Sequence, residues 1–140
     1  MTSRKQPQKQ YLIDTNYFLR LLIADVPEQF RSAQKLFREI EEGRAIGWVS
    51  LLVINELFWV LEHFYQQKRS LFVPQLIKLL ALKNIKVLEV KKAKLITVLE
   101  ATLKKKLDLT DWYLLFWARE EKLVLASFDK ELQSYFKAKN

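Results

Sequence analysis

The chain lacks several of the residues on which common catalytic sites depend. It has no cysteine, which excludes disulfides, a thiol nucleophile and any cysteine-bound zinc or iron–sulfur centre. Its one histidine, His63, cannot form a multi-histidine metal site, and two glycines are too few for a glycine-rich phosphate loop. No run of about 18 apolar residues is present, so we expect no membrane span. Carboxylates, hydroxyls, lysines and arginines therefore remain for any chemistry.

The residues that are plentiful indicate a basic globular domain. A length of 140 residues suits one domain, and a hydrophobic content of 50% supplies its core. The 24 Lys and Arg residues exceed the 16 Asp and Glu residues, and the resulting net charge of +8 favours a polyanionic partner such as nucleic acid. Residues 1–10 are polar and basic, without the apolar segment of a secretory signal. We therefore predict a flexible tail over 1–10, one domain over 11–140 and a cytoplasmic location.

Short apolar runs alternate with amphipathic segments along the chain. The runs predict strands at 11–13, 46–49, 85–88 and 123–126. The apolar spacing predicts helices at 15–23, 27–40, 51–65, 71–82, 93–105, 109–120 and 132–136. Strands that alternate with helices favour an α/β fold with a mostly parallel sheet and helices on both faces.

Two aspartates follow predicted strands. Asp14 comes directly after the first strand, and Asp129 lies just past the fourth. Ligands of open α/β sheets bind beyond the carboxyl ends of the strands, so both are candidate site residues. Helix capping is the alternative for each, because aspartate is among the best N-cap residues. The short polar residues Thr15, Asn16 and Ser127 carry the same ambiguity.

Two further acids lie within predicted helices. The neighbours of Glu56 at three and four positions along its helix are all apolar, which is costly for a carboxylate unless it is paired or bound to a cation. The alternative is that Glu56 belongs to a narrow exposed stripe. Asp111 lies three residues after Asp108 at the start of a helix, where acids also interact favourably with the helix dipole.

Taken together, these acids predict a metal site. They come from four segments that a parallel sheet could gather at one edge, and such a cluster repels itself unless it is neutralised. Oxygen-preferring divalent cations, Mg²⁺ or Mn²⁺, are the natural counterions. Metal ions among carboxylates on a basic protein suggest phosphodiester hydrolysis. The alternative is a non-catalytic basic module that binds RNA or a protein, with the acids as caps and surface charges.

Four short motifs resemble those of the PIN domain family, and most closely those of the VapC toxins of prokaryotic toxin–antitoxin pairs. They are Leu12-Ile-Asp14-Thr15-Asn16, Asn55-Glu56-Leu57, Leu109-Thr-Asp111 and Ser127-Phe-Asp129-Lys-Glu-Leu132. The resemblance implies a three-layer α/β/α sandwich with a mostly parallel sheet of four to five strands. It also implies a divalent-metal-dependent endoribonuclease, commonly a homodimer and often inhibited by an antitoxin protein. A PIN nuclease of RNA processing or DNA repair is the alternative within the family.

The resemblance also assigns roles to residues. It makes Asp14, Glu56, Asp111 and Asp129 the catalytic and metal-binding acids, held in place by Thr15, Asn16 and Ser127. Asp108 is an extra acid at the edge of the site, and Trp112 departs from the small residue that usually follows the third acid. On the enzyme hypothesis, the candidate contacts to the RNA backbone are Arg20, Arg31, Arg44, Lys104, Lys105 and Lys106.

The remaining aromatic residues are assigned to packing. We expect His63 on the surface or in packing rather than in catalysis. The tryptophans could stack on RNA bases, but three of the four lie in apolar helical patterns, which favours core or interface packing. They are Trp48, Trp59, Trp112 and Trp117.

Overall fold

The structure is a computed structural model that describes residues 8–139. Within that range the chain forms three β-strands, seven α-helices and one π-helical segment. The strands are β1 (Lys9–Leu12), β2 (Ala45–Val49) and β3 (Ile85–Val87). The helices are α1 (Thr15–Leu22), α2 (Pro27–Glu41), α3 (Leu51–Trp59), η1 (Val60–Phe64), α4 (Arg69–Leu80), α5 (Lys92–Ala101), α6 (Leu109–Glu120) and α7 (Lys130–Lys139).

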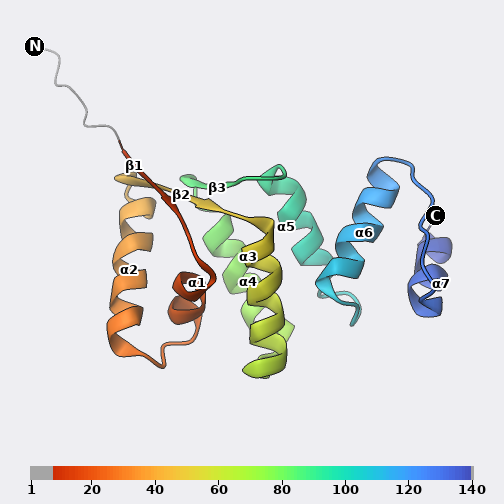
Figure 1. Ribbon diagram of the computed structural model, residues 1–140, viewed down its shortest axis with the longest axis horizontal. Helices are drawn as coiled ribbons and strands as arrows, with labels where there is room; N and C mark the ends of the chain where they lie inside the picture. Colours follow the sequence, from red (N-terminus) through yellow and green to blue (C-terminus); the bar gives the residue numbers. More distant parts are fainter. Residues whose placement is uncertain (1–7, 140) are drawn as a thin grey trace, which may run out of the picture.

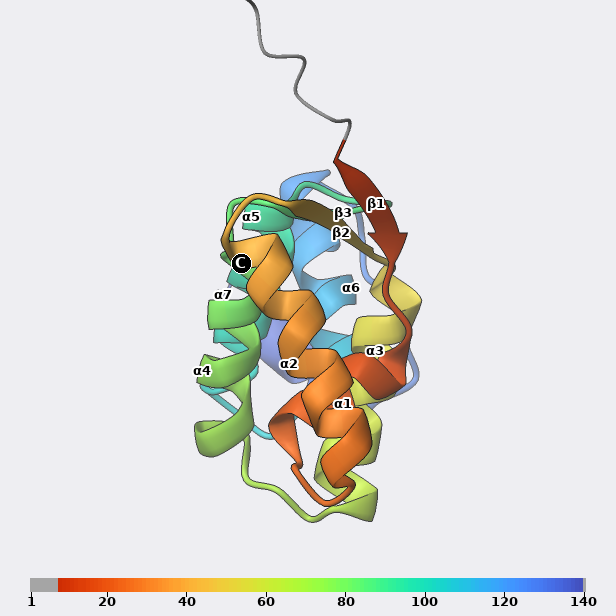
Figure 2. The same ribbon diagram turned by 90° about the vertical axis from the view of Figure 1, so that its left-hand side faces the viewer.

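The three strands form a parallel sheet in the order β1-β2-β3. Figures 1 and 2 show the strands along the top of the molecule and the helices below them. The central strand β2 alternates buried and half-buried residues. A Cβ atom at Gly47 would lie 2.7–2.8 Å from the side chains of Ile13, Ile40 and Ile85. Only glycine therefore lets the isoleucines of neighbouring elements close over the middle of the sheet.

The predicted helices α1 and α2 form because each buries one apolar stripe. Phe18 of α1 is completely buried and meets the edge of Phe37 of α2, with 5.3 Å between ring centroids. Pro27 begins α2, where its missing N–H has no consequence. Gly43 follows α2 with a φ of 81°, a value that favours glycine and that commonly ends a helix.

Three boundaries differ from the sequence prediction. Residues 1–7 of the predicted tail lie outside the described part, and Lys9 and Gln10 pair with β2 instead of belonging to the tail. The helix predicted over 51–65 is α-helical only to Trp59 and continues as the π-helical η1. The last helix begins at Lys130, two residues before the predicted start, because Asp129 caps it.

The fourth predicted strand is not formed. Residues 123–126 are not helical and pair with no strand within the part of the chain that the structure describes. Leu123 and Val124 are 58% and 91% exposed, so the run is not buried as a strand between neighbours would be. The sheet has three strands instead of the expected four to five, while the α/β class and the parallel arrangement are as predicted. The arrangement remains compatible with an α/β/α sandwich.

Trp112, the departure from the family pattern, packs into the interior. Its side chain is buried, and its indole N–H donates to the carbonyl oxygen of Lys105 at 3.2 Å. The ring meets the edge of Tyr135 from α7, with 5.2 Å between centroids. Trp112 therefore joins α6 to α7 and to the loop before α6.

Candidate functional site

Asp14 lies between β1 and α1, just after the strand, as the sequence predicted. Its Oδ1 accepts a hydrogen bond from the backbone N–H of Thr15 at 2.8 Å, which caps α1. The side chain is exposed and lines a hollow together with Asn16 and Arg20. The capping alternative is thus correct, but the cap uses one carboxylate oxygen and leaves the second for another ligand.

Asp129 has the corresponding position before α7. Its Oδ1 accepts from the backbone N–H of Leu132 at 3.0 Å, and its own N–H donates to the Ser127 hydroxyl at 3.0 Å. Gln133 adds hydrogen bonds to the carbonyl oxygens of Leu125 and Ser127, which fixes the chain leading to the aspartate. Ser127 therefore holds the backbone of Asp129, the kind of supporting role that the resemblance implies.

Asp111 lies in the first turn of α6 and is half-buried. Partial burial raises the pKa of Asp111, and the negative charges of Asp108, Asp129 and Glu131 raise it further. Asp108 occupies the N-cap position of α6, but its side chain makes no capping hydrogen bond there. At the N-terminal ends of α6 and α7, Asp111 therefore lies within electrostatic range of three other carboxylates.

Glu56 projects from α3 and is exposed. It lines a hollow of about 280 Å³ together with Asp108 and Thr110. The apolar neighbours that made Glu56 unusual are themselves exposed, since Leu52 is 78% and Trp59 is 61% accessible. The side of α3 that carries Glu56 is therefore an open face and not part of the core.

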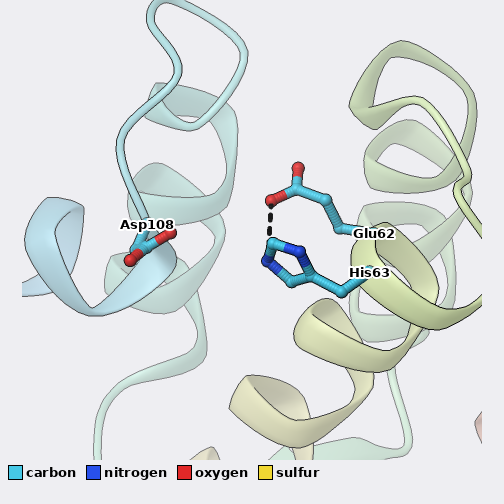
Figure 3. Close-up of side chains that lie close together, drawn as sticks. All are labelled: Glu62, His63 and Asp108. Carbon is cyan, nitrogen blue, oxygen red and sulfur yellow. Dashed lines mark ion pairs between the residues drawn. The ribbon is translucent and has the colours of Figure 1, made fainter.

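One group of side chains near these acids was not predicted. Glu62, His63 and Asp108 can each offer a ligand atom, and these atoms lie within 4.8 Å of one another, the only such group among the described residues. Figure 3 shows Glu62 and His63 extending from η1 toward Asp108 on the facing segment. No sequence spacing predicts this group, because Asp108 is far from Glu62 and His63 along the chain and meets η1 only through the tertiary fold.

Glu62 is already engaged by an arginine. Arg69 donates from Nε and Nη2 to the two oxygens of Glu62 at 2.5 and 3.1 Å, and both side chains are largely buried. His63 is half exposed, as expected for a surface residue, and its ring lies 5.2 Å from that of Trp59. The negative charge of Glu62 is thus balanced by Arg69, which leaves Asp108 as the less engaged carboxylate of the group.

The structure relates some of the four predicted acids to other acids through shared surroundings. Asp111 and Asp129 interact electrostatically, and Glu56 shares its hollow with Asp108. Asp14 lines a different hollow. Carboxylates that repel one another are the donor set that a hard divalent cation stabilises. The acids at the starts of α6 and α7 have the oxygen donors that Mg²⁺ or Mn²⁺ prefers, but no three of these described residues have ligand atoms within 4.8 Å of one another.

The six basic residues proposed to contact RNA differ in whether they form ion pairs with neighbouring acids. Arg20 pairs with Asp25 at 2.9 Å and also donates to Gln29, and Arg44 pairs with Glu42. Arg31 is exposed on α2. The three lysines that precede Leu107 are all exposed and line a second hollow, of about 540 Å³. They are Lys104, Lys105 and Lys106.

The domain is a parallel α/β fold with carboxylates after β1 and at the starts of α6 and α7, where ligands of such folds commonly bind. Residues 11–137 match the PIN domain family, and the chain belongs to that family. PIN domains are generally nucleases and typically bind divalent metals. Comparisons with curated proteins and with solved structures find no match for this chain. Among the described residues no helix is long and apolar enough to cross a membrane.

Proposed function

We propose that this PIN domain is a divalent-metal-dependent endoribonuclease that hydrolyses RNA phosphodiester bonds. Asp14, Glu56, Asp111 and Asp129 would hold Mg²⁺ or Mn²⁺ and form the catalytic site. The observation that carries the proposal is the match of residues 11–137 to the PIN domain family. Burial and the charges of three neighbouring acids, which raise the pKa of Asp111, support a cation site near this residue. Such repulsion is unfavourable in the protein alone and is relieved by a bound cation.

The chemistry that a divalent cation supplies when bound is stabilisation of negative charge on a phosphodiester and on its leaving oxygen. The residues of the chain have the remaining roles. Asp14 and Asp129 each use one carboxylate oxygen as a helix cap, which fixes the direction of the other. Ser127 holds the backbone of Asp129, and Thr15 and Asn16 directly follow Asp14. The exposed lysines before α6 supply positive charge for the RNA backbone.

The biological role that we propose is that of a toxin in a toxin–antitoxin pair, acting in the cytoplasm as a homodimer and inhibited by an antitoxin protein. The sequence motifs resembling VapC toxins support this role. Exposed apolar side chains such as Phe64 and Leu71, at 73% and 59%, favour contacts with protein partners. A neighbouring gene for a small antitoxin protein would support the toxin role, and its absence would favour RNA processing or DNA repair.

The decisive experiment is cleavage of total cellular RNA by the purified protein with Mn²⁺ or Mg²⁺, compared with EDTA. An Asp14→Asn/Asp111→Asn double variant tests the acids, and Glu41→Gln on the exposed side of α2 is the matched control. We expect discrete metal-dependent products from the wild type and from the control, but none from the double variant.

Metal binding, measured by calorimetric titration, separates the alternatives. Equal cleavage by the wild type and the double variant, with no metal bound by either, would favour the non-catalytic binding module. Metal binding that the double variant loses, without cleavage of total RNA, would keep the site and reject total RNA as its substrate.

A further inference from the structure

Arg20 on α1 is held in place by three neighbouring side chains. Its Nε donates to Gln29 at 2.8 Å, and its Nη1 donates to Asp25 at 2.9 Å and to the hydroxyl of Tyr65 at 3.3 Å. The Tyr65 hydroxyl in turn donates to the second oxygen of Asp25 at 3.4 Å. These partners come from α2, from the turn before α2 and from the end of η1, so the guanidinium is fixed from three directions.

One nitrogen of this guanidinium remains available to a ligand. Within residues 8–139, Nη2 is the nitrogen of Arg20 that makes no hydrogen bond. The Arg20 side chain is 20% exposed, so solvent or a ligand can reach it. An arginine that is already held in one position loses little conformational freedom when it binds an anion. Arg20 therefore has the properties of a preorganised anion ligand.

Arg20 also lines the hollow that contains Asp14. This hollow has a volume of about 330 Å³ and lies along α1 and α2, which Figure 2 shows next to each other. We call it the α1–α2 hollow. Its other lining residues are neutral and can form hydrogen bonds: Asn16, Tyr17, Gln29 and Ser32. Apart from Asp14, the hollow therefore offers a cation and neutral polar groups, which suit an anionic ligand.

Asp14 and Arg20 occupy different places along the α1–α2 hollow. Asp14 caps α1, and Arg20 lies six residues further on, about 9 Å along the helix axis at a rise of 1.5 Å per residue. A group bound at Arg20 is thus displaced from a group bound at Asp14 within the same hollow. The successive phosphates of one nucleic acid strand provide two such groups.

We propose that the α1–α2 hollow is a phosphate subsite of the proposed ribonuclease, in which Arg20 binds an RNA phosphate that neighbours the cleaved one. The inference rests on the proposed function and deepens it, because it assigns substrate binding to a residue outside the metal-binding acids. Nη2 donates its two N–H groups to the phosphate oxygens. Gln29, Asp25 and Tyr65 keep the guanidinium in the position that this contact needs.

Fluorescence anisotropy of a labelled RNA in EDTA measures this binding separately from cleavage. The probe is a mixed-sequence oligoribonucleotide of about ten nucleotides. Arg20→Gln should weaken binding about tenfold, because it removes a charge-assisted hydrogen bond to a phosphate. It should also make the fall of log affinity with log salt concentration less steep, by about 0.7, the value for one phosphate contact. Arg38→Gln removes an exposed arginine of α2 outside the hollow and is the matched control that changes neither quantity.

Two further variants separate phosphate binding from a purely structural role of Arg20. Arg20→Lys keeps the charge, so it should restore the salt dependence of the wild type but only part of its affinity, because an ammonium group lacks the planar fork of a guanidinium. Tyr65→Phe removes one partner of the guanidinium and keeps the arginine. It should therefore retain the salt dependence of the wild type, whatever its effect on the melting temperature.

A negative charge placed in the hollow tests the subsite without changing Arg20. Ser32→Glu introduces a carboxylate at an exposed lining position and should weaken RNA binding about as much as Arg20→Gln. Gln34→Glu adds the same charge to the exposed surface of α2 outside the hollow and should weaken binding less than about twofold. Both substituted positions are exposed, so both variants are expected to fold even if Arg20→Gln does not.

Equal affinities and equal salt dependences of folded Arg20→Gln and Arg38→Gln would overturn the inference and leave Arg20 as a link between helices. The same conclusion follows from equal affinities of Ser32→Glu and Gln34→Glu, or from a wild type that binds no RNA. Metal-dependent cleavage by the wild type measures the proposed nuclease function independently. If the wild type cleaves no RNA while Arg20→Gln loses binding as expected, the nuclease proposal fails and the phosphate site remains.

Discussion

The part of the chain from β1 to α5 and the part from Leu107 to α7 are stabilised in different ways. We call them the N-terminal body (9–101) and the C-terminal arm (107–139). In the body every strand has a partner, and side chains such as Phe18 and Leu57 are completely buried. In the arm, helices α6 and α7 bury residues such as Leu115, but the segment between them leaves Val124 and Phe128 fully or almost fully exposed.

This contrast shows that an apolar run forms a strand only where a neighbouring strand offers backbone groups for pairing. Residues 46–49 lie between β1 and β3, and their backbone groups are paired on both sides. Residues 123–126 are equally apolar but find no strand partner within the described chain. Strand formation depends on cross-strand neighbours more than on the propensity of the run itself.

The largest difference that we expect is in stability. Phe18→Ala removes a buried ring from the body and should lower the free energy of unfolding by about 3–5 kcal/mol. Val124→Asp changes an exposed residue of the arm and should alter it by less than about 0.5 kcal/mol. Urea denaturation measures both. If Val124→Asp costs more than about 2 kcal/mol, the segment 123–126 is buried in solution and the contrast disappears.

A smaller effect concerns the connection between body and arm. Arg69 of α4 binds Glu62 and donates to carbonyl oxygens of the chain between α5 and α6. Arg69→Met leaves the largely buried Glu62 carboxylate without its partner and should cost about 3 kcal/mol. Arg44→Met breaks the exposed pair with Glu42 and is the control, with an expected cost below about 1 kcal/mol. Equal losses in the two variants would show that Arg69 does not anchor the arm.

The proposed catalytic site combines residues of the body and of the arm. Measurements of RNA cleavage can test whether both regions contribute to it. Asp14 belongs to the body and Asp129 to the arm. If one site uses both, Asp14→Asn and Asp129→Asn should each reduce metal-dependent RNA cleavage at least about a hundredfold, or about 2.7 kcal/mol. Single-turnover cleavage with circular dichroism as a folding control gives the comparison. Full activity of Asp14→Asn would restrict the site to the arm.

The sequence predicted most of the secondary structure of the body and the local positions of the candidate acids, but not how side chains from distant segments meet. Helix and strand positions follow from local spacing, and Asp14 and Asp129 were correctly placed as caps after apolar runs. The approach of Glu62 and His63 to Asp108 could not be predicted, because it depends on how η1 faces the start of α6. The sequence left core and interface packing open for Trp59, and its exposure excludes the core, which an apolar helical pattern does not reveal in advance.

The smallest expected effect is the pH dependence of the metal-free protein. The pKa of Asp111 is raised in the folded state, chiefly by burial. Below the pKa of the unfolded chain both states carry the proton, so the acid has no effect on stability. As the pH rises toward the folded pKa, the unfolded state loses its proton first, and the folded state becomes less stable. Asp111→Asn should therefore raise the melting temperature at pH 7 in EDTA and change it little below pH 4.

Adding Mn²⁺ should stabilise the wild type and not the variant, because the cation relieves the repulsion that the substitution removes. A variant that melts lower than the wild type at pH 7 in EDTA would show that Asp111 is held by favourable contacts and not strained by its acidic neighbours.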